Sequence, residues 1–119
     1  MADTGLVISE YQGVTSVNFQ LNSIVEADVV QSISESLYEL VDRQALRKIM
    51  LDFSDVKFMS SQMVGVLVSL HNRARAIKGR VVLYAMKPEL RRVFQIMNLH
   101  KILEFAENED EALTKLNLL

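Results

Sequence analysis

Short apolar runs typical of buried strands alternate with helical patterns along most of this chain. Compact runs occur at residues 46–54 (LRKIMLDFS) and 80–86 (RVVLYAM), and each precedes a segment with helical spacing of its apolar residues. Such a run suits a central strand that is covered on both faces of its sheet. Because strands that alternate with helices pair in parallel through right-handed crossovers, the pattern predicts an α/β fold.

The first part of the chain predicts that the sheet is mixed. Residues 5–11 (GLVISEY) and 14–21 (VTSVNFQL) have the character of strands, and Gln12-Gly13 between them suits a tight hairpin turn. A further short strand is expected at residues 101–105, and helices are expected at residues 27–42, 60–79, 88–99 and 108–119. The predicted order is β-β-α-β-α-β-α-β-α, in a single domain that spans residues 1–119.

Single residues mark where the predicted helices begin and end. Pro88 fits a first helical turn, and Gly79 is a typical stop signal. Ser60 and Ser61 stand where a strand pattern becomes a helical one. Either hydroxyl can cap the helix by accepting a hydrogen bond from a free backbone N–H group.

The composition excludes several classes of function. The 119 residues include no cysteine, so the chain forms neither a disulfide nor a thiolate metal site. The net charge of −2 gives no general attraction to nucleic acid or anionic lipid. No apolar stretch approaches the about 18 residues of a membrane span, and no signal peptide is visible. We expect a cytoplasmic protein that neither inserts into a membrane nor binds nucleic acid directly.

Arrangements typical of catalysis are not visible in the sequence. Ser61 is not part of a G-x-S-x-G elbow. His71 follows it by ten residues, about 15 Å along a helix axis, and is too distant to act as its base. Asp52 and Asp55 near a strand end favour turn formation over a site. We expect no catalytic residue, no bound metal and no cofactor.

Basic residues and methionines are the other candidates for a binding surface. The basic residues gather in the segments 71–80 (HNRARAIKGR) and 87–92 (KPELRR), which contain no phenylalanine, tyrosine or tryptophan and therefore favour a solvated face over a nucleic-acid site. Met97 is expected to fill the core. Met63 continues an apolar helical stripe, and the pattern allows either core packing or contact with a partner.

Residues 50–113 resemble the second half of a STAS domain of the anti-sigma factor antagonist family. In this family a strand ends in L-D-[LF]-S, and the following helix starts at F-[MI]-D-S-[ST]-G-[LM]-G. The first motif is LDFS at residues 51–54, and the second corresponds to FMSSQMVG at residues 58–65. The earlier strands and helix also fit, so the resemblance covers nearly the whole chain.

The resemblance implies which residues form a regulated site. Ser61 corresponds to the family's phosphorylated serine, and Gly65 matches a motif glycine. The family's aspartate, second hydroxyl residue and first glycine are replaced by Ser60, Gln62 and Met63. A phosphate on Ser61 would lie at the positive end of the helix dipole, where backbone donors tolerate an anion.

By the same resemblance, the chain is expected to be a non-enzymatic switch. It would bind an anti-sigma factor of the serine-kinase type, free a sigma factor, and be inactivated by phosphorylation of Ser61. The expected partner-binding residues are Asn22, Ser23, Ser60, Ser61, Gln62, Met63 and Gly65. The alternative is a structural STAS module that scaffolds a bacterial signalling complex without being phosphorylated. An enzyme with Ser61 as its nucleophile is a distant third possibility.

Overall fold

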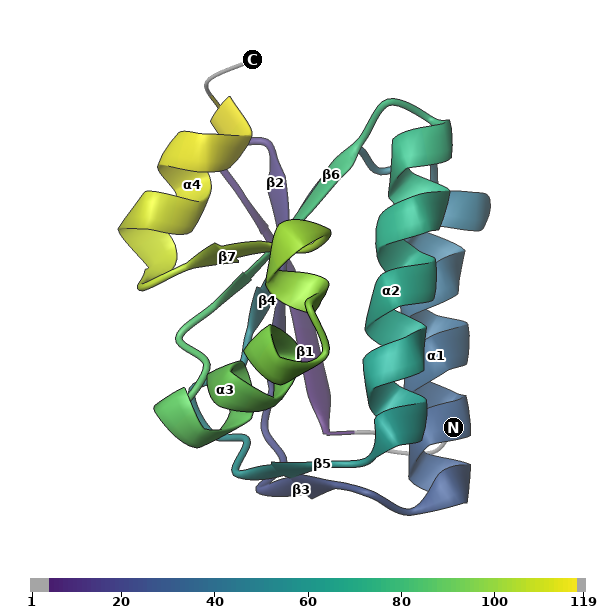
Figure 1. Ribbon diagram of the computed structural model, residues 1–119. Coiled ribbons are helices and arrows are strands. Elements are labelled where there is room, and N and C mark those ends of the chain that lie inside the picture. Colours follow the sequence, from purple (N-terminus) through teal and green to yellow (C-terminus); the bar gives the residue numbers. More distant parts are fainter. Residues whose placement is uncertain (1–4, 118–119) are drawn as a thin grey trace.

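A mixed five-stranded sheet forms the centre of the computed structural model, which describes residues 5–117 (Figure 1). The strands lie in the order β1-β2-β4-β6-β7. Their bounds are β1 (Leu6–Tyr11), β2 (Val14–Phe19), β4 (Lys48–Asp52), β6 (Arg80–Tyr84) and β7 (Glu104–Ala106). β1 and β2 are antiparallel, whereas every later neighbour pairs in parallel. The predicted α/β fold with a mixed sheet is confirmed.

The hairpin turn between β1 and β2 lies where the sequence predicts it. Gln12 and Gly13 have φ angles of 55° and 79°, as the two central residues of a type I′ turn require. Glycine adopts this conformation at little cost, because it has no Cβ. The turn places Tyr11 opposite Val14 and thereby sets the register of the hairpin.

Helices cover the sheet on both faces. α1 (Ala27–Asp42), α2 (Ser61–Ala76) and α3 (Pro88–Ile96) share one hydrophobic core with one face of the sheet, and α4 (Glu109–Asn117) packs on the other face (Figure 1). Since successive strand residues point to opposite faces, Ile49 and Leu51 belong to the first core and Met50 to the second. None of the helices between residues 5 and 117 has both the length and the apolar character needed to cross a membrane.

Three short elements were not predicted. β3 (Ser23–Ile24) and β5 (Phe58–Met59) pair in parallel as a separate two-stranded sheet. Two residues are too few for an alternating pattern to signal a strand. The 3₁₀ turn η1 (Leu99–Lys101) takes up the start of the strand expected at 101–105, so that β7 begins only at Glu104.

The end of α2 differs in detail from the prediction. The residue in the left-handed conformation is Lys78, with φ 63°, whereas Gly79 is required for a different reason. A Cβ at Gly79 would lie 2.9 Å from the Cα and the carbonyl oxygen of Arg47, at the start of the neighbouring strand segment. Gly79 therefore permits a close backbone approach at the point where β6 enters the sheet.

Candidate phosphorylation and partner-binding site

The two adjacent serines at the start of α2 occupy different structural positions. Ser60 is the N-cap residue, and its Oγ accepts a hydrogen bond from the backbone N–H of Met63 at 3.2 Å. A hydrogen-bonded N-cap of this kind typically stabilises the folded protein by about 1 kcal/mol. Ser61 is the first residue of the helix and is exposed, and its hydroxyl has no partner among residues 5–117. Ser60 is thus engaged in the fold, while the hydroxyl of Ser61 is free.

The start of α2 suits a negative charge on Ser61. The first turn contains no acidic residue, and its backbone N–H groups form the positive end of the helix dipole. Two cations stand on neighbouring segments, where Lys57 and Lys87 line a cavity of about 270 Å³ together with Phe58 and Glu89. A phosphate on Ser61 would therefore meet backbone donors and no carboxylate within its own helical turn.

Pairing of β3 with β5 brings the second predicted segment beside the serines. The carbonyl oxygen of Asn22 accepts a hydrogen bond from the N–H of Lys57 at 2.8 Å, and the N–H of Ser60 donates to Ile24 at 2.9 Å. Asn22 and Ser23 are exposed. Figure 1 shows β3 and β5 side by side at the end of the molecule where α1 and α2 begin. The structure therefore places residues 22–23 beside Lys57 and Phe58, which directly precede the two serines, and their role in binding stays a prediction.

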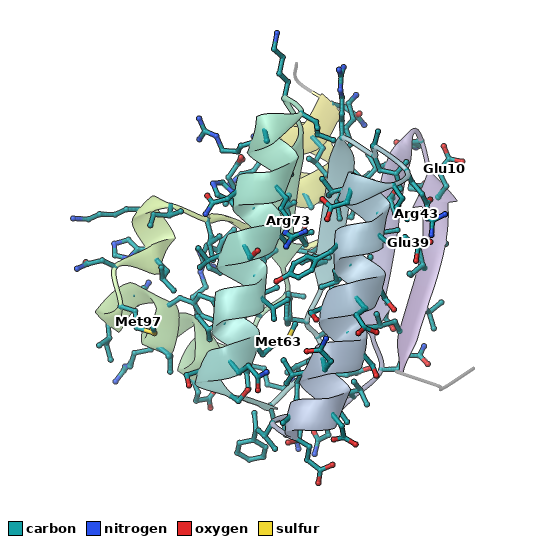
Figure 2. All side chains as sticks on the ribbon, turned by 90° about the vertical axis from the view of Figure 1, so that its right-hand side faces the viewer. Glu10, Glu39, Arg43, Met63, Arg73 and Met97 are labelled. Carbon is teal, nitrogen blue, oxygen red and sulfur yellow. The ribbon has the colours of Figure 1, made fainter. Side chains whose placement is uncertain are left out.

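Met63 lies in the core, and its side chain does not reach the protein surface. It is fully buried, and Figure 2 shows it between α1 and α2. The prediction that Met63 contacts a partner is therefore wrong in this structure. Its position three and four residues before Val66 and Leu67 places it on the inward face of the helix. Met97 shows the opposite error, because this expected core residue is about half exposed at the end of α3 (Figure 2).

Gln62 and Gly65 are exposed on the first turns of α2. Gly65 follows Ser61 by four residues and therefore lies above it on the same side of the helix. A Cβ at Gly65 would meet no atom within 4 Å, so packing inside the protein does not require a glycine. Glycine in a helix interior costs about 1 kcal/mol relative to alanine. Its presence here suits close approach by another backbone.

Sequence reasoning missed two apolar side chains near the serines. Phe58 in β5 is 60% exposed, and Val25, directly after β3, is 48% exposed. The sequence signal that could have identified Phe58 is its position at the start of the FMSS segment, two residues before Ser60. We define the helix-start surface as the exposed residues Asn22, Ser23, Val25, Phe58, Ser61, Gln62 and Gly65.

Hydrogen bonds to Asp52 stabilise the turn that follows β4 and leads toward the two serines. One carboxylate oxygen of Asp52 accepts a hydrogen bond from Asn18 Nδ2 at 2.8 Å, and the other accepts from the N–H of Ser54 at 2.9 Å. Burial, followed by the negative charge of Asp52, raises the pKa of Tyr84 to about 12, so its hydroxyl stays protonated at neutral pH. Asp52 is therefore a turn former, as the sequence predicts.

The titratable groups of residues 5–117 do not gather into a reaction centre around Ser61. His71 is buried near the other end of α2. Among residues 5–117, no three or more histidine, aspartate or glutamate side chains gather closely enough to hold a metal ion. That the chain has no catalytic residue, metal or cofactor stays a prediction.

The basic residues do not form one continuous free surface. Arg73 pairs with Asp42, and its guanidinium carbon lies 3.8 Å from the centre of the Tyr38 ring on α1 (Figure 2). Arg80 pairs with Glu104. These contacts join α2 to α1 and β6 to β7. Arg73 and Arg80 therefore stabilise the fold and are not free to bind a ligand.

Comparisons with known proteins agree with this geometry. The STAS domain family matches residues 6–112. BtrV of Bordetella bronchiseptica, named as a candidate anti-sigma factor antagonist, is 26% identical over 92 residues, which are 77% of this chain and 78% of BtrV. A structure named as a candidate anti-sigma factor antagonist from Thermotoga maritima has a TM-score of 0.81 at 19% identity, covering 93% of each chain. Phosphorylated SpoIIAA of Bacillus has a TM-score of 0.71 at 22% identity, covering 94% of this chain and 99% of that chain. The chain therefore belongs to the STAS domain family.

Proposed function

We propose that this protein is an anti-sigma factor antagonist whose binding is switched by phosphorylation of Ser61. It binds an anti-sigma factor of the serine-kinase type in the cytoplasm, frees a sigma factor, and acts as a single domain over residues 1–119. The free, exposed hydroxyl of Ser61 beside the capping hydroxyl of Ser60 carries the proposal. The names of BtrV and of phosphorylated SpoIIAA support it.

The helix-start surface explains how a phosphate can act without unfolding the domain. Ser60 provides the cap, and the exposed side chain of Ser61 makes no hydrogen bond among residues 5–117 that its modification would break. Its phosphate adds about two negative charges and is tolerated at the helix N-terminus. A partner that buries Val25 and Phe58 would have to desolvate that charge without having a matching cation, and this weakens binding.

Two departures from the family motif are compatible with this function. Ser60 replaces an acid but keeps the capping role, since serine and aspartate are comparable N-cap residues. Met63 replaces a glycine, yet its side chain fills the core between α1 and α2. The second change therefore alters internal packing and leaves the exposed surface without added bulk.

Capture of the partner from the source cell tests the proposal. The tagged protein should co-purify with a protein kinase of anti-sigma type, and part of the recovered chain should carry one phosphate. Mass spectrometry of the tryptic peptide 58–73 can assign that phosphate, because fragment ions separate Ser60, Ser61 and Ser69. A Ser61→Ala variant should keep the partner and lose the phosphate, whereas Ser60→Ala should keep both.

Two results would reject the phosphorylation switch. One is a phosphate found on Ser60 alone. The other is a captured partner that, once purified and supplied with ATP, never modifies the chain. The second result would favour the alternative of a structural STAS module that scaffolds a signalling complex.

A Gly65→Ala substitution should raise the stability of the protein and lower its affinity for the partner. Stability should rise by up to about 1 kcal/mol, because alanine is the better helix former and its Cβ meets open space. Affinity for the captured partner should fall about threefold or more, because the methyl group obstructs close approach. Urea unfolding and calorimetric titration measure the two effects. Asn72→Ala, at an exposed position late in the same helix, is the control and should leave affinity unchanged. Unchanged affinity in Gly65→Ala would remove Gly65 from the contact.

A further inference from the structure

A cationic cavity lies at the opposite end of α2 from the two serines. Its volume is about 390 Å³, and it is lined by His71, Arg75, Lys78, Gly79, Arg80 and Glu104. These residues come from the last turns of α2, the turn that follows, and the first residues of β6 and β7. Figure 1 shows this end of α2 far from β3 and β5. The cavity is therefore separate from the helix-start surface.

The single carboxylate of the cavity is already neutralised. Arg80 donates from Nε to Glu104 at 3.1 Å and from a terminal nitrogen to the other carboxylate oxygen. Its remaining terminal nitrogen donates to the carbonyl oxygen of Lys115 at 2.7 Å. The hydrogen bonds from Arg80 lower the pKa of Glu104, which therefore stays ionised. The Arg80–Glu104 ion pair therefore lines one side of the cavity and contributes no net charge to it.

Two further cations of the cavity have no partner among residues 5–117. Neither Arg75 nor Lys78 makes an ion pair or a side-chain hydrogen bond within the part of the chain that the structure describes. Lys78 also holds the left-handed position after α2, which glycine or asparagine fills more easily. The turn therefore gives no reason for an ammonium group at this position. Since the Arg80–Glu104 pair cancels, two positive charges remain uncompensated.

His71 adds a neutral hydrogen-bond donor to the same cavity. Its side chain lines the cavity although the residue is only 5% exposed, and its Nδ1 is buried without a hydrogen-bond partner. Burial, followed by the charge of Arg75, lowers the pKa of His71 against the opposing effect of Glu104. The ring is therefore neutral at pH 7 and carries one proton. Because Nδ1 has no acceptor among residues 5–117, the arrangement favours the tautomer with the proton on Nε2.

We propose that this cavity binds a small anionic ligand through a phosphate group, with Arg75 and Lys78 supplying charge and His71 supplying a neutral donor. Arginine and lysine are the usual cationic partners of phosphate, and the cavity volume lies within the about 300–1,000 Å³ of small-molecule pockets. The carbonyl oxygens of Ala74 and Arg75 at the end of α2 accept hydrogen bonds from the turn that follows, which reduces their repulsion of an anion.

The two histidines of the chain provide an internal comparison for the test. Inorganic phosphate is titrated into the full-length protein at constant ionic strength, with chloride as the replaced anion, and the imidazole NMR signals are followed. His71 should shift to saturation, and its pKa should rise, because a bound anion stabilises the imidazolium form. His100 is exposed in η1 outside the cavity and should not change.

Charge-matched variants locate the binding site. Arg75→Gln or Lys78→Gln should weaken phosphate binding about tenfold. Arg43→Gln removes an equal charge from an exposed position at the C-terminal end of α1 and should have no effect (Figure 2). Amide NMR spectra establish that each variant is folded. Weakening by either cavity variant supports the site.

The proposal is overturned if the His71 signal does not saturate, if both histidines respond alike, or if both cavity variants bind phosphate as tightly as the unaltered protein. Ser61 is unchanged in every one of these proteins. Failure of this test therefore leaves the proposed switch function standing, and failure of the switch leaves the cavity proposal standing.

Discussion

The Ser61→Glu protein is expected to remain folded and to bind the captured anti-sigma factor at least about tenfold more weakly than the unaltered protein. Ser61 is exposed at the first position of α2, and its side chain makes no hydrogen bond within residues 5–117 that the substitution would remove. An acid near a helix N-terminus changes stability by tenths of a kcal/mol up to about 1 kcal/mol. The loss of binding follows because an unpaired charge must be desolvated at the interface.

Two other substitutions separate charge from size at this position. Ser61→Gln has nearly the shape of Ser61→Glu without its charge, so it should weaken binding much less. Ser60→Asp restores the acid of the family motif and keeps the cap, and it should also weaken binding less than Ser61→Glu. Calorimetric titration measures affinity, and urea unfolding establishes that each protein is folded. If Ser61→Glu binds as tightly as the unaltered protein, the switch is rejected and the structural module becomes the leading function.

Leu51→Ala should lower the free energy of unfolding by about 2–5 kcal/mol. Leu51 is fully buried in β4, the middle strand of the sheet, and lies between Val17 of β2 and Leu83 of β6. Truncation removes buried methyl groups and leaves a cavity beneath α1 and α2 that the surrounding strands cannot close.

Urea unfolding measures this loss, and Ile8→Ala is a suitable comparison. Ile8 lies in the edge strand β1 and is about half exposed, so its truncation should cost much less than that of Leu51. Leu51→Met keeps most of the volume and should cost less than about 1.5 kcal/mol. A loss below about 1 kcal/mol for Leu51→Ala would contradict the placement of Leu51 in the core.

Much of the fold could be predicted because the relevant signals are local. The run at 46–54 is apolar on both sides, and this property alone marks a strand covered by helices on two faces. The helix predicted at 27–42 has the bounds of α1, since its apolar spacing stops where the helix does. The strand predicted at 101–105 began too early, because η1 depends on how that segment packs after α3.

Part of the candidate site was also readable from the sequence. The order of LDFS and FMSS identified a strand end and a helix start, and the resemblance singled out Ser61. Nothing in the sequence distinguished the roles of the two serines, since either hydroxyl can cap a helix. That distinction depends on the extended backbone of Ser60, which aims its oxygen at the N–H of Met63.

The sequence by itself determined the alternation of strands and helices, the hairpin turn at Gln12-Gly13 and the serine at the start of α2, because each depends on neighbours along the chain. Only the tertiary structure decided which residues share a surface or a cavity. β3 brings Ser23 beside Phe58 and Ile24 to Ser60, and α1 packs over Met63. The first residues of β6 and β7 meet His71 at the far end of α2. These contacts join residues that are distant in sequence, so their chemistry exists only once the sheet and helices are packed together.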